Sequence, residues 1–215
     1  VGNPALRPQF TNSVELGYKN TWDNGYFYSA LYHRFANGTI TRISSIVPGS
    51  TLIYAIFQNA GRSYNTGLEA VFNQKVSSVY SFNLNGNMYR NQINAYSVQN
   101  LYPTPNTFSA DKQIAISGNL KLNNTFHFSK AWDAQLTAVY LAPDIIPQGK
   151  ISSRFSIDAG LKKSVQKGKG ELFFNATDLL NTMVIKKQIT GIGFHYTSDD
   201  YYETQVFRLG YSYKF

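Results

Sequence analysis

The sequence predicts an all-β protein: an antiparallel up-and-down meander that forms part of a large transmembrane β-barrel. Three observations predict this fold class. Apolar and polar side chains alternate over long stretches, short and long connections alternate along the chain, and only 15% of the residues are charged, against about a quarter in a typical soluble domain. Aromatic residues make up another 15%, which excludes an intrinsically disordered chain.

The composition excludes several other classes of protein. The 215 residues include no cysteine, so disulfide frameworks, thiolate zinc sites and cysteine nucleophiles are excluded. Lys and Arg (20) outnumber Asp and Glu (12), which gives a net charge of +8, but the basic residues are scattered and predict no nucleic-acid partner. No apolar run approaches the ~18 residues that a membrane-spanning helix needs.

Long stretches of the chain alternate with a period of two residues, which is typical of strands with one apolar face. Even positions from Ile114 to Phe128 are mostly apolar, whereas the odd positions between them are mostly polar. Residues 80–89 and 207–215 follow the same pattern. In chain order we expect about nine strands, at residues 12–22, 25–47, 51–75, 78–91, 112–128, 132–141, 152–165, 170–180 and 203–215.

The connections between these strands are alternately short and long. Residues 23–25 read Asp-Asn-Gly, a strong hairpin signal, and Pro48-Gly49 favours a turn that joins two strand extensions. The long connections are expected to be loops, at residues 92–111, 142–150 and 181–202. Short turns at one end of the strands and long loops at the other are typical of bacterial outer-membrane barrels.

The charged residues of the clear strands fall on the faces opposite the apolar ones. This holds for Glu69, Lys121, Asp133, Lys162, Arg208 and Lys214. Because a charge that faces lipid at mid-depth costs ~2–4 kcal/mol, we expect outward faces free of charge against hydrocarbon and inward faces against water. A soluble β-sandwich also has alternating strands, but they are usually shorter.

The strand count also bears on how much of a barrel the chain supplies. With Phe215 at the periplasmic end, an odd count of nine strands places Ser13 at the extracellular end. A complete bacterial barrel has an even number of strands. We therefore expect residues 1–215 to be a single C-terminal section of a larger barrel, with the plug domain and the earlier strands absent.

Several motifs resemble those of TonB-dependent outer-membrane receptors, in the subfamily of outer-membrane β-barrels. Residues 2–18 read GNPALRPQFTNSVELGY and resemble the family's "G-N-P-x-L-x-P-E…E-x-G" segment, with Gln9 in place of the usual Glu. Residues 65–69 (NTGLE) resemble its "x-G-x-E" strand, and residues 177–182 (TDLLNT) its "D-L-x-N" before the final hairpin. Phe215 matches the usual terminal aromatic residue.

The resemblance implies a barrel of about 22 strands with a plugged lumen, in the outer membrane of a Gram-negative bacterium. It implies contact with outer-membrane lipid, the barrel-assembly machinery, the TonB complex through the missing plug and, in some cases, a surface lipoprotein. The expected function is import of a scarce solute: a chelate, an oligosaccharide or a peptide. Two alternatives are a non-transporting barrel or scaffold in a surface assembly, and a soluble β-rich adhesin or binding module.

Two groups of residues are candidates for function. A ligand is expected at the aromatic and acidic residues of one long connection: Phe194, His195, Tyr196, Asp199, Asp200, Tyr201 and Tyr202. Aromatic rings stack on sugars or flat chelates and Asp accepts hydroxyl hydrogen bonds, although barrels also carry aromatic margins without ligands. A barrel-assembly signal is expected at Tyr211, Tyr213 and Phe215. No catalytic residues, cofactor or metal site are expected.

Overall fold

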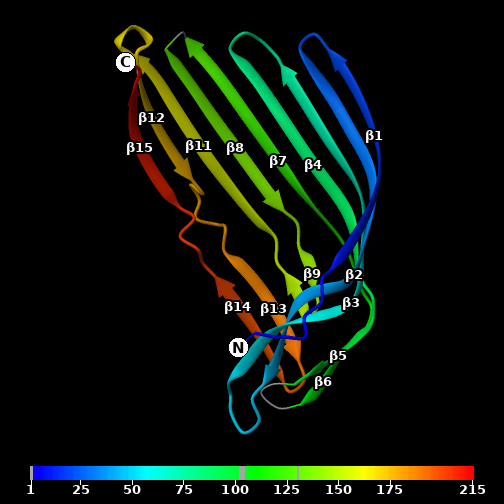
Figure 1. Cartoon of the computed structure of the whole chain (residues 1–215). Helices are drawn as coiled ribbons and strands as arrows, with labels where there is room; N and C mark the ends of the chain where they lie inside the picture. The colour runs from blue at the N-terminus through cyan, green and yellow to red at the C-terminus, as the bar shows by residue number, and fades with distance from the viewer. Residues whose placement is uncertain (1, 102–104, 130) are drawn as a thin grey trace.

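The computed structural model describes residues 2–101, 105–129 and 131–215 and consists of antiparallel sheets (Figure 1). The largest sheet, here called the wall, has nine strands in the order β1-β2-β3-β4-β7-β8-β11-β12-β15. Their bounds are β1 (Phe10–Trp22), β2 (Gly25–Ile46), β3 (Ile53–Lys75), β4 (Tyr80–Ile93), β7 (Gln113–Ser129), β8 (Trp132–Leu141), β11 (Arg154–Val165), β12 (Gly170–Thr177) and β15 (Val206–Tyr213). The predicted all-β antiparallel meander is confirmed. Within the described residues, no helix is long and apolar enough to cross a membrane.

The long connections contain six further strands, so the expectation that they are loops was wrong. These strands are β5 (Tyr96–Asn100), β6 (Asn106–Ala110), β9 (Asp144–Ile146), β10 (Gly149–Ile151), β13 (Ile185–Gly191) and β14 (Phe194–Asp200). Each connection folds back on itself as an antiparallel hairpin: β5 with β6, β9 with β10, and β13 with β14. Such pairing satisfies the backbone donors and acceptors of a long excursion locally.

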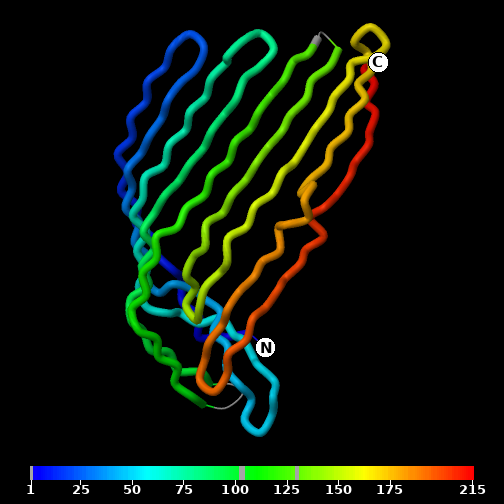
Figure 2. Tube along the Cα trace, turned by 180° about the vertical axis from the view of Figure 1, so that it is seen from behind, coloured from blue at the N-terminus to red at the C-terminus, as the bar shows by residue number. Residues whose placement is uncertain are grey.

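The two ends of the wall differ in the same way as the two ends of a bacterial barrel (Figures 1 and 2). Short turns, including the 3-10 turn η1 (Gln166–Gly168), lie at one end together with the C-terminus. The N-terminus and the long connections lie at the other end. Barrels of this kind have their short turns in the periplasm and their longer loops outside the cell. We therefore refer to these ends as the periplasmic and extracellular ends.

The wall is a curved sheet that does not close (Figure 2). Its first and last strands, β1 and β15, each pair with one neighbour among the described residues. Because every neighbouring pair is antiparallel, the first and ninth strands run in the same direction. The wall is therefore a section of a sheet with two free edges.

One face of the wall is continuously apolar, although it lies on the surface. Leu16, Leu31, Leu68 and Met88 occupy neighbouring positions across β1 to β4, and 47–77% of each residue is exposed. Farther along the wall, Ile116 is 74% exposed on the same face. Exposed contiguous apolar surface of this kind is the outward, lipid-facing side of a membrane barrel.

Aromatic side chains border this apolar face at both ends. On the extracellular side, the rings of Phe35 and Tyr64 stack with their centroids 6.5 Å apart. On the periplasmic side, the rings of Phe72 and Phe82 lie 5.7 Å apart. Tyr64 and Phe72 are eight residues apart on β3, which is ~20 Å of membrane depth at ~3.3 Å per residue and a strand tilt of ~40°. This height is close to the ~25 Å apolar band of outer-membrane barrels.

The opposite, inward face carries polar and charged side chains that pair with one another. Glu15 and Arg34 form an ion pair with an N–O distance of 3.9 Å. Asp133 bonds to His127 at 2.6 Å and to Lys162 at 3.0 Å. Neighbouring inward positions hold asparagine and threonine, such as the Thr137 hydroxyl that donates to Asn123. The inward face is therefore suited to contact with water.

The outward face is not free of charge, so that expectation was wrong. Arg90 follows Met88 on the outward side of β4 and is exposed near the extracellular end. Lys163 shares the outward side of β11 with Leu161, and its ammonium group lies 4.7 Å from the centre of the Trp132 ring near the periplasmic end. Both side chains are long enough to place their charges at the margin of the membrane. Charge is excluded from the middle of the outward face rather than from all of it.

Two glycines mark the point where the β2–β3 hairpin leaves the wall. Gly38 and Gly61 face each other in the register, are omitted from the pairing, and have φ values of +63° and +44°. Positive φ favours glycine. A Cβ atom on Gly61 would also lie 2.9 Å from Cβ of Tyr96. From this kink to its tip, the hairpin bends toward the β13–β14 hairpin (Figures 1 and 2).

The assignment of outward and inward faces predicts opposite effects for two adjacent residues of β15. Leu209 is 80% exposed and pairs with Phe174, whereas Arg208 pairs with Asn175 on the other face. Leu209→Arg is expected to destabilise the folded protein by ~2–4 kcal/mol because it places a charge in lipid. Arg208→Leu is expected to be tolerated. Urea unfolding in lipid vesicles measures both, and equal losses of stability would contradict the assignment.

Candidate functional site

The extracellular end of the chain forms a cap over the end of the wall. We define the cap as residues 39–60 of the kinked β2–β3 hairpin together with the hairpins β5–β6, β9–β10 and β13–β14. β13 pairs with β14 on one side and with β10 on the other, so β14, β13, β10 and β9 form one four-stranded sheet. Connections that are distant in sequence are thus joined by backbone hydrogen bonds.

A buried glutamine ties this sheet to β2. The side-chain Oε1 of Gln148 accepts a hydrogen bond from the backbone N–H of Ser44 at 2.6 Å, and its Nε2 donates to the carbonyl of Ser44 at 3.0 Å. Both residues are 6% exposed. The amide thus replaces a strand partner for one residue of β2. The Gln148 carbonyl also accepts from the N–H of Thr190 in β13.

The cap has a small hydrophobic core of its own. Its buried members come from β2, β3, β4 and the β5–β6 hairpin: Ile43, Ala60, Ile93, Tyr96, Val98 and Phe108. The Tyr96 hydroxyl donates to the Pro147 carbonyl at 3.0 Å, and burial raises the pKa of Tyr96 to about 12. The fully buried Asn100 donates to Ser45 and Asn106 and accepts from Gln58. The cap is therefore a packed unit rather than a set of independent loops.

The N-terminal segment lies along the cap and is held by side-chain amides. Asn59 accepts a hydrogen bond from the backbone N–H of Arg7 at 2.8 Å and donates to the Arg7 carbonyl and to the Gly38 carbonyl. Asn3 donates to the Phe57 carbonyl at 2.9 Å. Oε1 of Gln9 accepts from the N–H of Ile40. The G-N-P-x-L-x-P-Q motif therefore holds the segment before β1 against β2 and β3.

The D-L-x-N motif also has a structural role. The carboxylate of Asp178, a residue that is 2% exposed, accepts hydrogen bonds from the Thr204 hydroxyl at 2.6 Å and from the backbone N–H groups of Thr182 and Met183. The backbone N–H of Asp178 donates to the side chain of Asp158 in β11. The motif thus joins the ends of β11, β12 and β15 where the β13–β14 hairpin leaves the wall.

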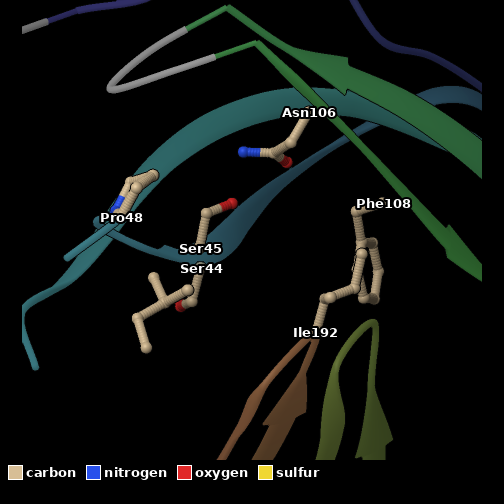
Figure 3. A pocket seen from close by; sticks show the side chains of 7 residues that line it. Ser44, Ser45, Pro48, Asn106, Phe108 and Ile192 are labelled. Carbon is tan, nitrogen blue, oxygen red and sulfur yellow. The ribbon is translucent and has the colours of Figure 1, made fainter. Parts of the chain in front are cut away.

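Two cavities lie within the cap, beside a more open hollow of about 490 Å³ whose lining includes Phe108, Gln113 and Thr190. The smaller, of about 150 Å³, is lined by Ser44 and Ser45 of β2, Pro48 of the hairpin tip, Asn106 and Phe108 of β6, and Ile192 of the β13–β14 turn (Figure 3). The larger, of about 420 Å³, lies between the β2–β3 hairpin and the sheet of β9, β10, β13 and β14. Its polar lining residues are Thr41, Arg42, Ser44, Gln148, Lys187, Tyr196, Ser198 and Asp200. A cavity of this size with several hydrogen-bonding groups fits a small polar solute.

One ion pair lies on the wall of the larger cavity. Nζ of Lys187 is 2.7 Å from Oδ2 of Asp200, and the Ser198 hydroxyl donates to the other carboxylate oxygen. The hydrogen bond from Lys187 and that from Ser198 hold the pKa of Asp200 below its usual range. Within the described part of the chain, Arg42 has no ion pair, so it supplies the cavity with a net positive charge.

The structure divides the predicted ligand residues between two faces. Tyr196 and Asp200 line the larger cavity, whereas His195 and Asp199 are exposed on the opposite face of β14. Nδ1 of His195 bonds to the Thr190 hydroxyl, and Asp199 lies 3.7 Å from Lys186. Phe194 packs its ring over Gly191, and Tyr201 and Tyr202 follow the strand, 49% and 64% exposed. The seven residues therefore do not form a single site.

The predicted assembly residues lie together at the periplasmic end. Tyr211, Tyr213 and Phe215 are 51%, 41% and 112% exposed on the outward side of β15 and its end. The rings of Tyr213 and Phe215 meet edge to face at 5.4 Å, and the Tyr211 hydroxyl donates to Gln166. Their role in assembly stays a prediction.

Sequence reasoning missed several residues that shape the cap. Gln148 and Asn100 are ordinary polar residues in segments that were expected to be loops, and their partners are distant in sequence. The alternation of residues 194–200 could have predicted a strand there. In a strand, the side chains at even and odd positions lie on opposite faces. Among the described residues, no group of three or more His, Asp or Glu side chains is arranged to hold a metal ion.

Nearly the whole chain matches a known protein family. Residues 1–213 match the model described as "Outer membrane protein beta-barrel family". No curated protein matches the sequence.

Gln148 is predicted to hold the cap together. Gln148→Leu leaves the buried N–H and carbonyl of Ser44 without their partner and is expected to weaken cap docking by about 3 kcal/mol. Hydrogen exchange at Ser44, measured by mass spectrometry in detergent, should become faster. Gln188→Leu, which changes an exposed amide on β13, is the control. Unchanged exchange at Ser44 in Gln148→Leu would refute this role.

Burial of Tyr96 predicts a loss of cap stability at high pH. The pKa of an unperturbed tyrosine is about 10, and that of docked Tyr96 is about 12. Since ionisation favours the undocked state, docking is stable below pH 10 and weakens as the pH rises toward 12. Ultraviolet titration should show that Tyr96→Phe removes an absorbance change only near pH 12. The control, Tyr202→Phe, alters an exposed ring and should leave the absorbance change near pH 12 in place.

Proposed function

Because the chain belongs to the outer membrane protein beta-barrel family and lies in the outer membrane of a Gram-negative bacterium, we propose that it is the C-terminal barrel section of a TonB-dependent receptor that imports a scarce solute. Its place in the outer membrane excludes the soluble adhesin alternative. The observation that carries the proposal is a polar cavity of about 420 Å³ at the extracellular end of a sheet that is apolar outside and polar inside.

The edges of the wall support a larger barrel. An unpaired strand edge in hydrocarbon leaves backbone donors and acceptors without partners, which costs several kcal/mol for each group. The two edge strands of the wall run in the same direction, and bacterial barrels are closed by antiparallel pairs. An odd number of additional strands must then separate β1 from β15. A barrel of about 22 strands meets this condition.

The lining of the larger cavity suits the proposed solutes. Hydroxyl and amide groups of Thr41, Ser44, Ser198 and Gln148 can exchange hydrogen bonds with an oligosaccharide or a peptide. Tyr196 offers the aromatic surface that a sugar ring or a flat chelate stacks on. The polar inward face of the wall then provides a wet route from this cavity toward the periplasm.

The proposed partners follow from the parts of the receptor. The TonB complex would act through a plug domain, which these residues do not supply. The barrel-assembly machinery would read the exposed aromatic residues Tyr211, Tyr213 and Phe215. A surface lipoprotein, if one belongs to the receptor, would sit on the cap.

Energy-dependent uptake tests the proposal. The intact protein is expressed in a strain that lacks its own gene for it. The cells are then given fluorescent ferric chelates, oligosaccharides or peptides, with and without a protonophore. One class should accumulate, and the protonophore should abolish its accumulation. If no class of solute accumulates, or if the protonophore does not reduce uptake, the receptor assignment is wrong and a non-transporting scaffold is favoured.

The two faces of β14 provide matched variants for the same assay. Tyr196→Ala removes a ring that lines the cavity and should reduce uptake about tenfold, equivalent to about 1.4 kcal/mol. His195→Ala alters the adjacent exposed side chain and should leave uptake within about twofold of the original protein. Equal losses in the two variants would place the ligand elsewhere.

A further inference from the structure

Three cations gather on the outward side of the wall at its extracellular end. Arg62 precedes Tyr64 on the outward side of β3, Arg90 follows Met88 on the outward side of β4, and Lys112 stands immediately before β7. All three residues are exposed. Arg62 and Arg90 occupy strand positions that face lipid and not the lumen, and Lys112 stands where the outward alternation of β7 would continue.

The strand register places these cations close together. Arg90 pairs with Ile116 of β7, and Lys112, which precedes that strand, is four residues nearer the extracellular end. Thr66 pairs with Arg90 on the other side, and Arg62 is again four residues nearer that end. Arg62 and Lys112 are therefore ~13 Å along the strands from Arg90 and ~10 Å from each other. The three charges form a triangle that spans β3, β4 and the start of β7.

These charges are not neutralised by the protein. In the part of the chain that the structure describes, none of the three forms an ion pair, and no outward position of β1 to β4 or β7 holds Asp or Glu. Asp111 is the nearest acidic residue in sequence and forms no ion pair with Lys112. On the inward face, by contrast, Arg34 and Lys162 are paired with carboxylates.

An apolar surface overlaps the lower part of the triangle and continues below it. Tyr64, whose ring stacks with that of Phe35, lies between Arg62 and Arg90 in height, and Ile116 pairs with Arg90. Leu68 and Met88 continue this surface toward the middle of the membrane. A ligand that matches both parts has anionic groups at the rim and acyl chains beneath them. A soluble anion would match only the cations, and a neutral lipid only the apolar surface.

We propose that Arg62, Arg90 and Lys112 bind the phosphate groups of a phosphorylated glycolipid of the outer leaflet, with its acyl chains on the apolar face below. This leaflet meets the extracellular end of the wall, where the long connections lie. Cations beside an anionic membrane surface strengthen binding by about fivefold each. The site is separate from the cavity in the cap and does not depend on what the protein transports.

Native mass spectrometry of the intact protein in neutral detergent tests this site with purified lipid A as the probe. Replacing Arg62, Arg90 and Lys112 together by Gln should weaken lipid A binding at least tenfold. The control replaces Lys19, Lys121 and Arg208 by Gln, which removes the same charge from the inward face. The control should bind lipid A within twofold of the original protein.

Two further lipids decide which chemistry is recognised. Lipid A whose phosphates have been removed should bind the original protein and the outward triple variant equally. Phosphatidylglycerol should compete at least tenfold less well than lipid A for the original protein. The proposal is wrong if the outward variant binds lipid A normally, if both triple variants lose binding equally, or if phosphatidylglycerol competes as well as lipid A.

Discussion

The structure depends on one constraint: inside a hydrocarbon layer, every backbone N–H and carbonyl must find its partner within the protein. The nine strands of the wall meet it through lateral pairing, which extends over 14 residue pairs between β4 and β7. Because a strand sends successive side chains to opposite faces, the same pairing separates lipid-facing from water-facing residues. The apolar outer face, the polar inner face and the exclusion of charge from mid-depth all follow from this arrangement. The constraint also makes the two edges of the wall the places where a partner is required.

The extracellular end obeys different rules because water is available there. Its strands are short, its polar groups bond to one another across long sequence separations, and it has its own small core around Ile43 and Phe108. Where the strands are not paired regularly, the Gln148 side chain bonds to the backbone of Ser44 in place of a neighbouring strand, and the Asn100 side chain joins neighbouring segments. The cap is thus organised like a small soluble domain that stands on a membrane-embedded sheet. This difference explains how a smooth wall can carry an irregular, cavity-containing surface.

The sequence was sufficient for the wall and insufficient for the cap. A period of two residues is a local signal, so the alternation from Ile114 to Phe128 predicted strand, face and approximate length. The cap depends on partners such as Ser44 and Gln148, which are 104 residues apart, and composition gives no indication of such a pair. The candidate site was affected in the same way. The aromatic and acidic residues near Tyr196 were visible, but without the β13–β14 hairpin their division between two faces was not. The expectation of a charge-free outward face was wrong at Arg90 and Lys163, because alternation assigns a residue to a face but does not give its depth in the membrane.

The opposed glycines Gly38 and Gly61 separate two parts of a single hairpin that are subject to different structural constraints. Below them, bilayer thickness fixes how long β2 and β3 must be. Beyond them, the hairpin can gain or lose residue pairs in evolution without disturbing the neighbours of either strand in the membrane. Related chains could therefore vary the reach of this arm, and with it the shape of the cap, while inheriting an unchanged transmembrane frame.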